Sequence, residues 1–251
     1  MKNHQVIAIS GATSGMGHAV LNTASQNNAA VVFSGRRNER IRQIEEEHGK
    51  LGHSVFGLCA DVITADHYAR LNVLAEKKTG QVPTAFVLCA GRGLPGTLTT
   101  SDPEQWQELI NINVLAAMHQ LRSCAAFFSD QANISPRVRD IVVIGSTVGR
   151  SLSAANPVYG ATKFALHSLV ESLRQELCAK QIRVTLIEPG FVRSEFQTVA
   201  GYDMDWFDNI EQEQGPFLNA QDIADVIQYA LELPPHVHVD DFRIRPTKQR
   251  V

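Results

Sequence analysis

The chain has 251 residues and a formal net charge of −3, with 44% hydrophobic, 20% charged and 7% aromatic residues. This composition is typical of a globular protein and excludes a disordered, collagen-like or coiled-coil chain. Lys and Arg do not outnumber Asp and Glu, and they form no cluster beyond Arg36-Arg37. A nucleic-acid surface or a polybasic membrane patch is therefore not expected.

Cysteine spacing and hydropathy narrow the cellular setting. The four cysteines, Cys59, Cys89, Cys124 and Cys178, are widely spaced, which favours reduced thiols over a disulfide framework or a metal site. His236 and His238 have the spacing of a ligand pair but no evident third ligand, so no metal is expected. The N-terminal apolar run is too short for a signal peptide, and no apolar stretch approaches the ~20 residues that span a bilayer. We expect a soluble cytoplasmic protein.

The predicted elements alternate between strands and helices. Compact apolar runs, typical of strands buried on both faces, occupy 6–9, 30–33, 54–59, 84–88, 140–144 and 182–187, with a last candidate strand at 239–244. Helical spacing covers about 18–27, 38–48, 64–78, 103–128, 158–179 and 220–233. This alternation predicts one α/β, doubly wound Rossmann-type domain over 1–251, with a mostly parallel seven-stranded sheet. The segment 192–218 has little periodicity and is interpreted as a substrate lid at the carboxyl ends of the strands.

A glycine-rich turn follows the first predicted strand. Gly11, Gly15 and Gly17 have the spacing G-x3-G-x-G, and Thr13, Ser14 and Met16 lie between them. Glycines at such a turn let backbone N–H groups approach a pyrophosphate at the start of the next helix. The whole turn is therefore a candidate dinucleotide site, although a merely tight turn would look similar.

The residues at the end of the second predicted strand indicate which dinucleotide the site would bind. An NAD site usually has an acidic residue there, to accept from the ribose 2′-hydroxyl. This chain instead has Arg36 and Arg37, with no acid before Glu39. Because guanidinium groups suit a 2′-phosphate, the sequence predicts NADP(H), with one of the two arginines, more readily Arg37, free to be a solvated helix-start residue.

Tyr159 and Lys163 share one helix face at i and i+4, and Ser146 follows the fifth strand. A free tyrosine has a pKa of about 10 and is a poor base at neutral pH. Lowering that pKa by about three units takes about 4 kcal/mol. A lysine cation about 4 Å away supplies a similar energy at an effective dielectric near 20. The pair is thus suited to exchanging a proton with a carbonyl or alcohol oxygen.

These motifs, taken together, resemble the short-chain dehydrogenase/reductase family over essentially the whole chain. The matching residues are Ser10 to Gly17, Asp61-Val62, Cys89-Ala90-Gly91, Asn113, Gly145-Ser146, Tyr159 with Lys163, and Pro189-Gly190. Two of these motifs depart from the family pattern. Leu88-Cys89 replaces a pair of asparagines, which removes a side-chain amide that braces the central strands, and Ser10 replaces a threonine.

The resemblance implies roles for individual residues. Tyr159 would be the acid/base, Ser146 would hold the substrate oxygen, Lys163 would bind the nicotinamide ribose, and Asn113 would hold a water that relays protons. The implied cofactor contacts are the turn residues Gly11, Thr13, Ser14, Gly15, Met16 and Gly17, then Arg36, Arg37, Asp61, Val62, Ala90, Gly91, Tyr159, Lys163, Pro189, Gly190, Val192 and Ser194. Relatives usually form homodimers or homotetramers through the two long helices and the last strand, although the apolar faces of those helices could equally be core.

The substrate side is less determined. Within the family the chain resembles NADP-dependent hydroxy-acid (serine-type) dehydrogenases and the clavulanate-forming reductase, which implies a small polar hydroxy acid or a related aldehyde or ketone. A substrate carboxylate would need an arginine, and Arg92, Arg150 and Arg193 follow strand ends but could equally face solvent. Likewise, Phe196, Tyr202, Trp206 and Phe207 could close over a substrate or pack a short helix. A non-catalytic NADP-binding sensor on the same fold is the alternative to an enzyme.

Overall fold

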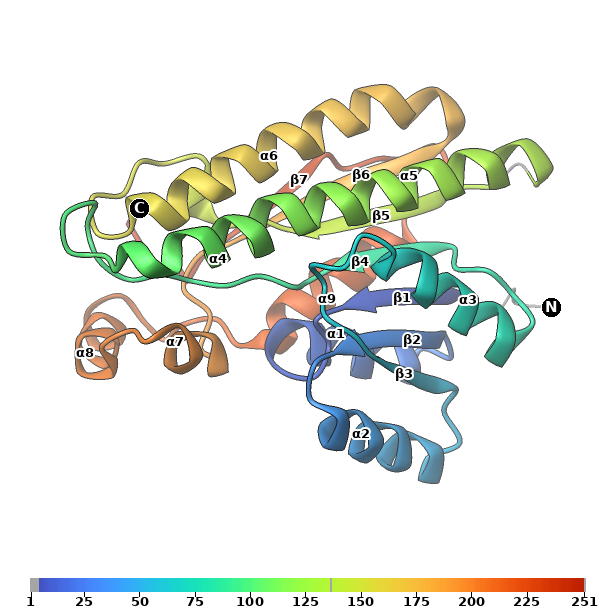
Figure 1. Ribbon diagram of the computed structural model, residues 1–251, viewed down its shortest axis with the longest axis horizontal. Helices are drawn as coiled ribbons and strands as arrows, with labels where there is room; N and C mark the ends of the chain where they lie inside the picture. Colours follow the sequence, from blue (N-terminus) through green and yellow to red (C-terminus); the bar gives the residue numbers. More distant parts are fainter. Residues whose placement is uncertain (1–4, 136, 251) are drawn as a thin grey trace.

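The computed structural model describes residues 5–135 and 137–250, which build one α/β unit around a parallel sheet (Figure 1). All seven strands run parallel in the order β3-β2-β1-β4-β5-β6-β7, which confirms the predicted doubly wound architecture. The strands are β1 (Val6–Ser10), β2 (Ala30–Gly35), β3 (Val55–Cys59), β4 (Ala85–Leu88), β5 (Arg139–Ile144), β6 (Ile182–Pro189) and β7 (Asp241–Ile244). The strand order reverses between β1 and β4, and such a switch point opens a crevice at the carboxyl ends of the strands.

Helices cover both faces of this sheet. The main helices are α1 (Gly15–Gln26), α2 (Asn38–Lys50), α3 (His67–Thr79), α4 (Trp106–Ile110), α5 (Ala117–Ile134), α6 (Pro157–Leu177), α7 (Glu195–Ala200), α8 (Met204–Gln214) and α9 (Ala220–Glu232). One core packs α1, α2 and α9 against one sheet face, and a second core packs α3, α5 and α6 against the other. Successive strand residues divide between the two cores, with Ile7 in the first and Ala8 in the second, as the period of two along a strand requires.

The predicted helix at 103–128 differs from the observed one in shape and length. It begins as a 3₁₀ turn (Pro103–Gln105), continues as α4, widens into a π-helical segment (Asn111–Ala116) and ends with α5 at Ile134. A π turn holds an extra residue, so it changes which side chains face the sheet. Periodicity in the sequence did not reveal this segment because its residues remain apolar on both sides of Asn113.

The segment 192–218 was predicted to be irregular, and this prediction was wrong, because the segment folds into α7 and α8. Ser194 caps α7 through its hydroxyl, which accepts the N–H of Phe196, and Asp203 caps α8 by accepting from Asp205 and Trp206. With 6 residues α7 is shorter than the window of about 11 to 18 residues in which apolar periodicity can be recognised, and α8, with 11 residues, only just fills that window. The Ser and Asp caps were the available signals.

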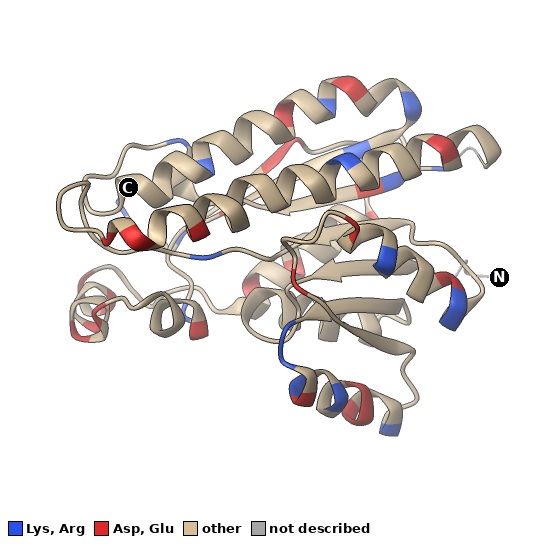
Figure 2. Cartoon of the chain, viewed as in Figure 1, with Lys and Arg blue, Asp and Glu red and all other residues tan. Residues whose placement is uncertain are grey.

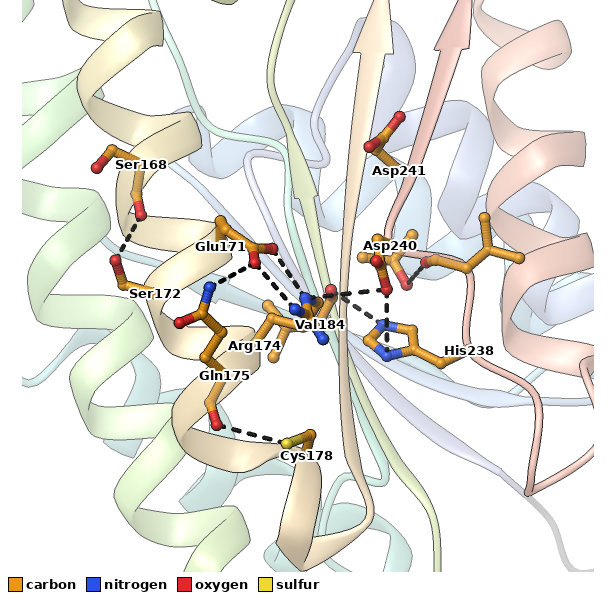
Figure 3. Close-up of polar contacts among 12 residues, drawn as sticks. Ser168, Glu171, Ser172, Arg174, Gln175, Cys178, Val184, His238, Asp240 and Asp241 are labelled. Carbon is orange, nitrogen blue, oxygen red and sulfur yellow. Dashed lines mark hydrogen bonds and ion pairs between the residues drawn. The ribbon is translucent and has the colours of Figure 1, made fainter.

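A polar network on the outer side of α6 ties this helix to the segment that precedes β7 (Figure 3). Arg174 forms an ion pair with Glu171 at 2.8 Å and lies 3.9 Å from Asp240. His238 donates from Nε2 to the carbonyl of Val184 on β6 at 3.1 Å. His238 is thus part of the packing of the sheet edge.

Candidate functional site

The residues singled out from the sequence meet at the carboxyl edge of the sheet. They occupy the turns after β1, β2, β3, β4 and β5, the start of α6, and the end of β6. A cavity of about 550 Å³ lies there and brings together Met16, Gly91, Ser146, Tyr159, Lys163, Pro189, Gly190, Val192 and Ser194. The other candidates, among them Arg36, Arg37, Asp61, Val62 and Asn113, do not line this cavity, since they lie along the edge beside it or behind its wall.

The turn after β1 requires glycine at two positions in particular. Gly11 has a φ of +72°, and an added Cβ would lie 2.8 Å from the Cα of Ala90. At Gly17 a Cβ would overlap the carbonyl oxygen of Gly11. Ser14, the N-cap of α1, makes no side-chain capping bond, and the first turn of α1 holds no acidic residue. The N-terminus of α1 therefore keeps backbone N–H groups available to an anion.

The two arginines after β2 have different surroundings. Arg37 donates to the carbonyl of Thr13 at 3.1 Å and pairs with Glu195 at 3.2 Å, so it links the glycine turn to α7. Arg36 is exposed, and its guanidinium has no hydrogen-bond or ion-pair partner among residues 5–135 and 137–250. Arg36 is thus the arginine whose charge is free, while the Asp61 carboxylate accepts the N–H of Ile63 at 3.2 Å.

Tyr159, Ser146 and Lys163 lie together in the cavity wall. Burial raises the pKa of Tyr159 above its usual value, with a smaller contribution from Tyr202, and a hydrogen bond with Ser146 opposes the rise. Lys163 Nζ donates to the carbonyl of Ile144 at 3.0 Å and lies 5.8 Å from the centroid of the Tyr159 ring. Burial lowers the pKa of Lys163 to about 8.

At Tyr159 the loss of hydration outweighs the attraction expected between its phenolate and the Lys163 cation. The expected depression of the Tyr159 pKa is therefore not seen here. The phenol keeps its proton at neutral pH and is ready to donate it.

Asn113 lies in the π-helical segment with its amide turned toward the turn after β4. Its Oδ1 accepts the N–H of Arg92 at 2.8 Å, and its Nδ2 donates to the Arg92 carbonyl at 2.8 Å and to Thr162 Oγ1 at 3.1 Å. A Cβ at Gly91 would lie 3.5 Å from Asn113 Oδ1 and 3.7 Å from Lys163 Nζ. The amide thus fixes the turn beside Lys163, a contact that a regular helix register would not place there.

Reasoning from the sequence missed His167, which lies one helical turn after Lys163. Its Nε2 accepts the backbone N–H of Ser146 at 3.3 Å, and a side chain at Gly145 or Gly149 would overlap the imidazole ring. Burial, with Lys163 and Arg150 nearby, lowers the pKa of His167 to about 4, so the ring is neutral. The two glycines around Ser146 were the available signal, because a strand end flanked by glycines often accommodates a close neighbour.

The three arginines considered as carboxylate ligands are each paired within the chain. Arg92 pairs with Glu108, and Arg193 pairs with Asp208 at 2.7 Å and with Glu211. Arg150 binds the fully buried Glu188 at 2.6 Å and Asp241 at 2.7 Å. Of the described residues that line the cavity, Lys163 and the exposed Arg250 are the ones with a positive charge, and none is Asp or Glu.

The aromatic residues of 192–218 both pack and line the cavity. Phe207 is buried and forms a cluster with Phe191 and Phe217, with ring centroids 4.8 to 6.0 Å apart. Phe196 lies 6.1 Å from the Tyr159 ring and 6.5 Å from the Tyr202 ring, measured between centroids. One group of these aromatics therefore anchors α8 and the other forms a wall of the cavity, while closure over a substrate stays a prediction.

Comparison with known proteins identifies the family to which the chain belongs. The family model described as short chain dehydrogenase matches residues 5–204. The chain belongs to the short-chain dehydrogenase/reductase family. An uncharacterized oxidoreductase of Staphylococcus epidermidis is 30% identical over 96% of this chain and 97% of its own length. A second, from Staphylococcus saprophyticus, is 28% identical over 96% and 97%. The protein is accordingly an oxidoreductase.

Solved structures agree with this family in fold. The closed form of serine dehydrogenase complexed with NADP+ has a TM-score of 0.88 and 25% identity, with 98% of this chain and 97% of that one covered. An alcohol dehydrogenase from Thermococcus sibiricus complexed with 5-hydroxy-NADP has a TM-score of 0.83 and 23% identity, with 99% of each chain covered. Within the described ranges, no helix is long and apolar enough to cross a membrane, and no group of three or more His, Cys, Asp and Glu could hold a metal ion.

Proposed function

We propose that this short-chain dehydrogenase/reductase transfers hydride between NADP(H) and a carbonyl or alcohol carbon, with Tyr159 as the acid/base. The observation that carries the proposal is the meeting of Tyr159, Ser146 and Lys163 in one cavity at the switch point of the sheet. Open α/β sheets bind ligands at this place.

The residues of this chain fit an NADP cofactor. The uncapped N-terminus of α1 would hold the pyrophosphate, and the unpaired Arg36 would meet the 2′-phosphate. Asp61 and Val62 would bracket the adenine, and Ala90 and Gly91 would line the channel. Pro189, Gly190, Val192 and Ser194 would flank the nicotinamide. NADP-bound serine dehydrogenase supports this choice of cofactor, since its chain overlays almost the whole fold.

When bound, NADPH supplies a hydride to the carbonyl carbon of the substrate. Ser146 would hold the carbonyl oxygen, and Tyr159 would give that oxygen its phenolic proton, so that a ketone becomes an alcohol. The raised pKa of the buried Tyr159 suits the acid role. The Lys163 cation stabilises the phenolate left behind, and a proton from solvent restores the phenol. In the oxidation direction the steps are reversed, so that the Tyr159 phenolate would accept the proton of the alcohol.

The expected small hydroxy-acid substrate has limited support from the site. The overlay with serine dehydrogenase favours it. However, Arg92, Arg150 and Arg193, the residues that could have bound its carboxylate, are all paired with acids of this chain. Carbonyl reduction as such does not depend on that choice, and a keto acid, levulinate, is among the substrates compared below.

The proposal is tested with Tyr159→Phe and a matched variant, Tyr68→Phe, which removes an equally buried phenol hydroxyl from the α3 side of the core. We expect Tyr159→Phe to lower kcat by about a thousandfold or more, because general acid–base catalysis contributes 10²–10⁴-fold. NADPH affinity, measured by titration calorimetry, should stay within about threefold of the wild type. Full activity in Tyr159→Phe would refute the acid/base role, and NADPH binding without turnover of any carbonyl would favour a sensor.

We also propose a homodimer or homotetramer that forms through α5, α6 and β7. The large apolar residues left exposed here are Met118 on α5, Phe164 on α6 and Leu115 in the π-helical segment just before α5. The segments 109–121 and 157–170 hold one charged residue, the buried Lys163. Figure 2 shows the corresponding ribbon almost free of colour. The four cysteines are free thiols, in keeping with the proposed reducing, cytoplasmic setting.

A further inference from the structure

Resting on the proposed function, we propose that the physiological carbonyl substrate carries an uncharged aromatic or aliphatic group about as large as a phenylalkyl chain. This group would lie between the loop 151–156 and the helices α7 and α8. Three separate features of the cavity favour it over a carboxylate.

The first feature is the cavity wall itself. Beyond Tyr159, the wall on the side of α7 and α8 is formed mainly by apolar and aromatic side chains, namely Val148, Leu152, Phe191, Phe196, Tyr202 and Trp206, with the polar Asn156, Gln197 and Gln214 among them. Phe196 and Tyr202 lie against the backbone at Gly93, where a Cβ would come within 2.8 Å of the Phe196 ring. The wall is therefore preformed by packing. Apolar walls with few polar groups are typical of sites that bury most of an uncharged ligand.

The second feature is the distribution of charge. Arg92, Arg150 and Arg193 are paired with Glu108, Glu188 and Glu211, respectively. Lys163 is committed to the carbonyl of Ile144 at 3.0 Å. Apart from Arg250, the described lining residues offer a carboxylate at α7 and α8 no unpaired arginine to replace its hydration, which is unfavourable. Arg250 remains as an exposed cation in the lining and gives the competing hypothesis a definite test.

The third feature is the mouth of the cavity. Leu152 is 90% exposed and Trp206 is 42% exposed, yet both line the same cavity from different elements. Large apolar side chains that are exposed at a concave site gain by covering an apolar ligand. Leu152 follows Ser146 in the chain by six residues, and Trp206 lies on α8. They would therefore contact the group that extends away from the reacting carbonyl.

The test uses three methyl ketones that differ in one substituent. Benzylacetone carries a phenyl ring where levulinate carries a carboxylate, and acetone carries neither. With NADPH in excess, kcat/KM for benzylacetone should exceed that for levulinate by about 100-fold, since burying a phenyl ring stabilises a complex and an unpaired carboxylate does not. Trp206→Ala should lower kcat/KM for benzylacetone about tenfold and leave acetone within about twofold. Val199→Ala, an exposed residue of α7 outside the cavity lining, is the matched control and should change neither.

A binding measurement keeps the test independent of turnover. The Tyr159→Phe variant loaded with NADPH should form a complex that does not turn over, to which benzylacetone should bind about 100-fold more tightly than levulinate by calorimetry. Equal or reversed affinities, or no binding of benzylacetone, would overturn the substrate proposal. If levulinate wins and Arg250→Ala abolishes its advantage, the substrate is a carboxylate held by Arg250. Failure of the proposed function is distinct, because the wild type would then fail to bind NADPH or reduce any of the three ketones.

Discussion

Acid should destabilise this protein through His67, and the size of the effect follows from the surroundings of the ring. His67 is fully buried at the first turn of α3, with Nε2 2.8 Å from Ser34 Oγ. Burial, assisted by the charge of Arg70 and opposed by Asp61 and Asp66, lowers the pKa of His67 to about 4. The positive end of the α3 dipole also disfavours a cation at this position.

The direction of the effect follows from proton binding. In the unfolded chain the pKa of His67 is about 6.5, so between that value and about 4 the unfolded state binds a proton that the folded state does not. The free energy of unfolding therefore has its full value above about pH 6.5 and falls as the pH drops toward 4. At about 1.4 kcal/mol per pH unit, His67 alone accounts for about 3 kcal/mol of this loss.

Chemical denaturation at a series of pH values, in the wild type and in His67→Gln, isolates this contribution. Glutamine can still bond to Ser34 and does not titrate, and His167 together with all the carboxylates is common to both proteins. The variant should be less stable at neutral pH by about 1 kcal/mol. It should then lose about 3 kcal/mol less than the wild type between about pH 6.5 and 4. Parallel pH profiles for the two proteins would refute the reasoning.

Three further outcomes are expected from the ion pairs and exposed groups. Arg36→Ala should weaken NADPH binding about tenfold or more and leave NADH binding nearly unchanged, whereas Arg37→Ala should affect the binding of both cofactors alike. If calorimetry shows that Arg36→Ala weakens NADPH and NADH binding equally, Arg36 does not contact the 2′-phosphate. Arg150→Ala removes the arginine that pairs with the fully buried Glu188 carboxylate, and it should lower the free energy of unfolding in urea by about 3 kcal/mol. An unchanged urea midpoint would show that the ion pair contributes little to stability. Met118→Lys should shift a dimer or tetramer toward monomer in analytical ultracentrifugation, and an unaltered mass would place the subunit contact elsewhere.

The sequence allowed the sheet, its helices and the meeting of Ser146, Tyr159 and Lys163 in one cavity to be predicted, because each depends on local patterns. Apolar runs bounded by turns identified β1 to β6, and the glycines at Gly11 and Gly17 occupy positions where a side chain cannot fit. By contrast, the pairing of Arg150 with Glu188 joins residues 38 positions apart in the chain. No pattern in the sequence indicates that such a charge is already neutralised. The sequence therefore could not show that all three candidate arginines are paired with acids of the chain.

The Tyr159 pKa could not be predicted from the sequence for a related reason. The expected effect considered a single charge at an assumed distance, whereas the value in the folded chain is governed mainly by how much water the surrounding side chains exclude. His167 was missed because its contact runs from a helix to a backbone N–H beyond the strand end. Burial and contacts between distant elements are properties of the packed molecule, and they cannot be predicted from the spacing of residues along the chain.

The π-helical segment has a consequence for comparing this chain with its relatives. One extra residue in a turn rotates all that precedes it by about 100° relative to all that follows. Leu109, buried beside Tyr159, and Leu121, buried in the sheet core, can face their respective neighbours because of that phase shift. A one-residue gap within Asn111–Ala116 of a homologous sequence would restore a regular helix and turn one of these two faces toward solvent. Such a gap would mark a reorganised active-site wall, whereas a gap of the same length in a surface loop would change little.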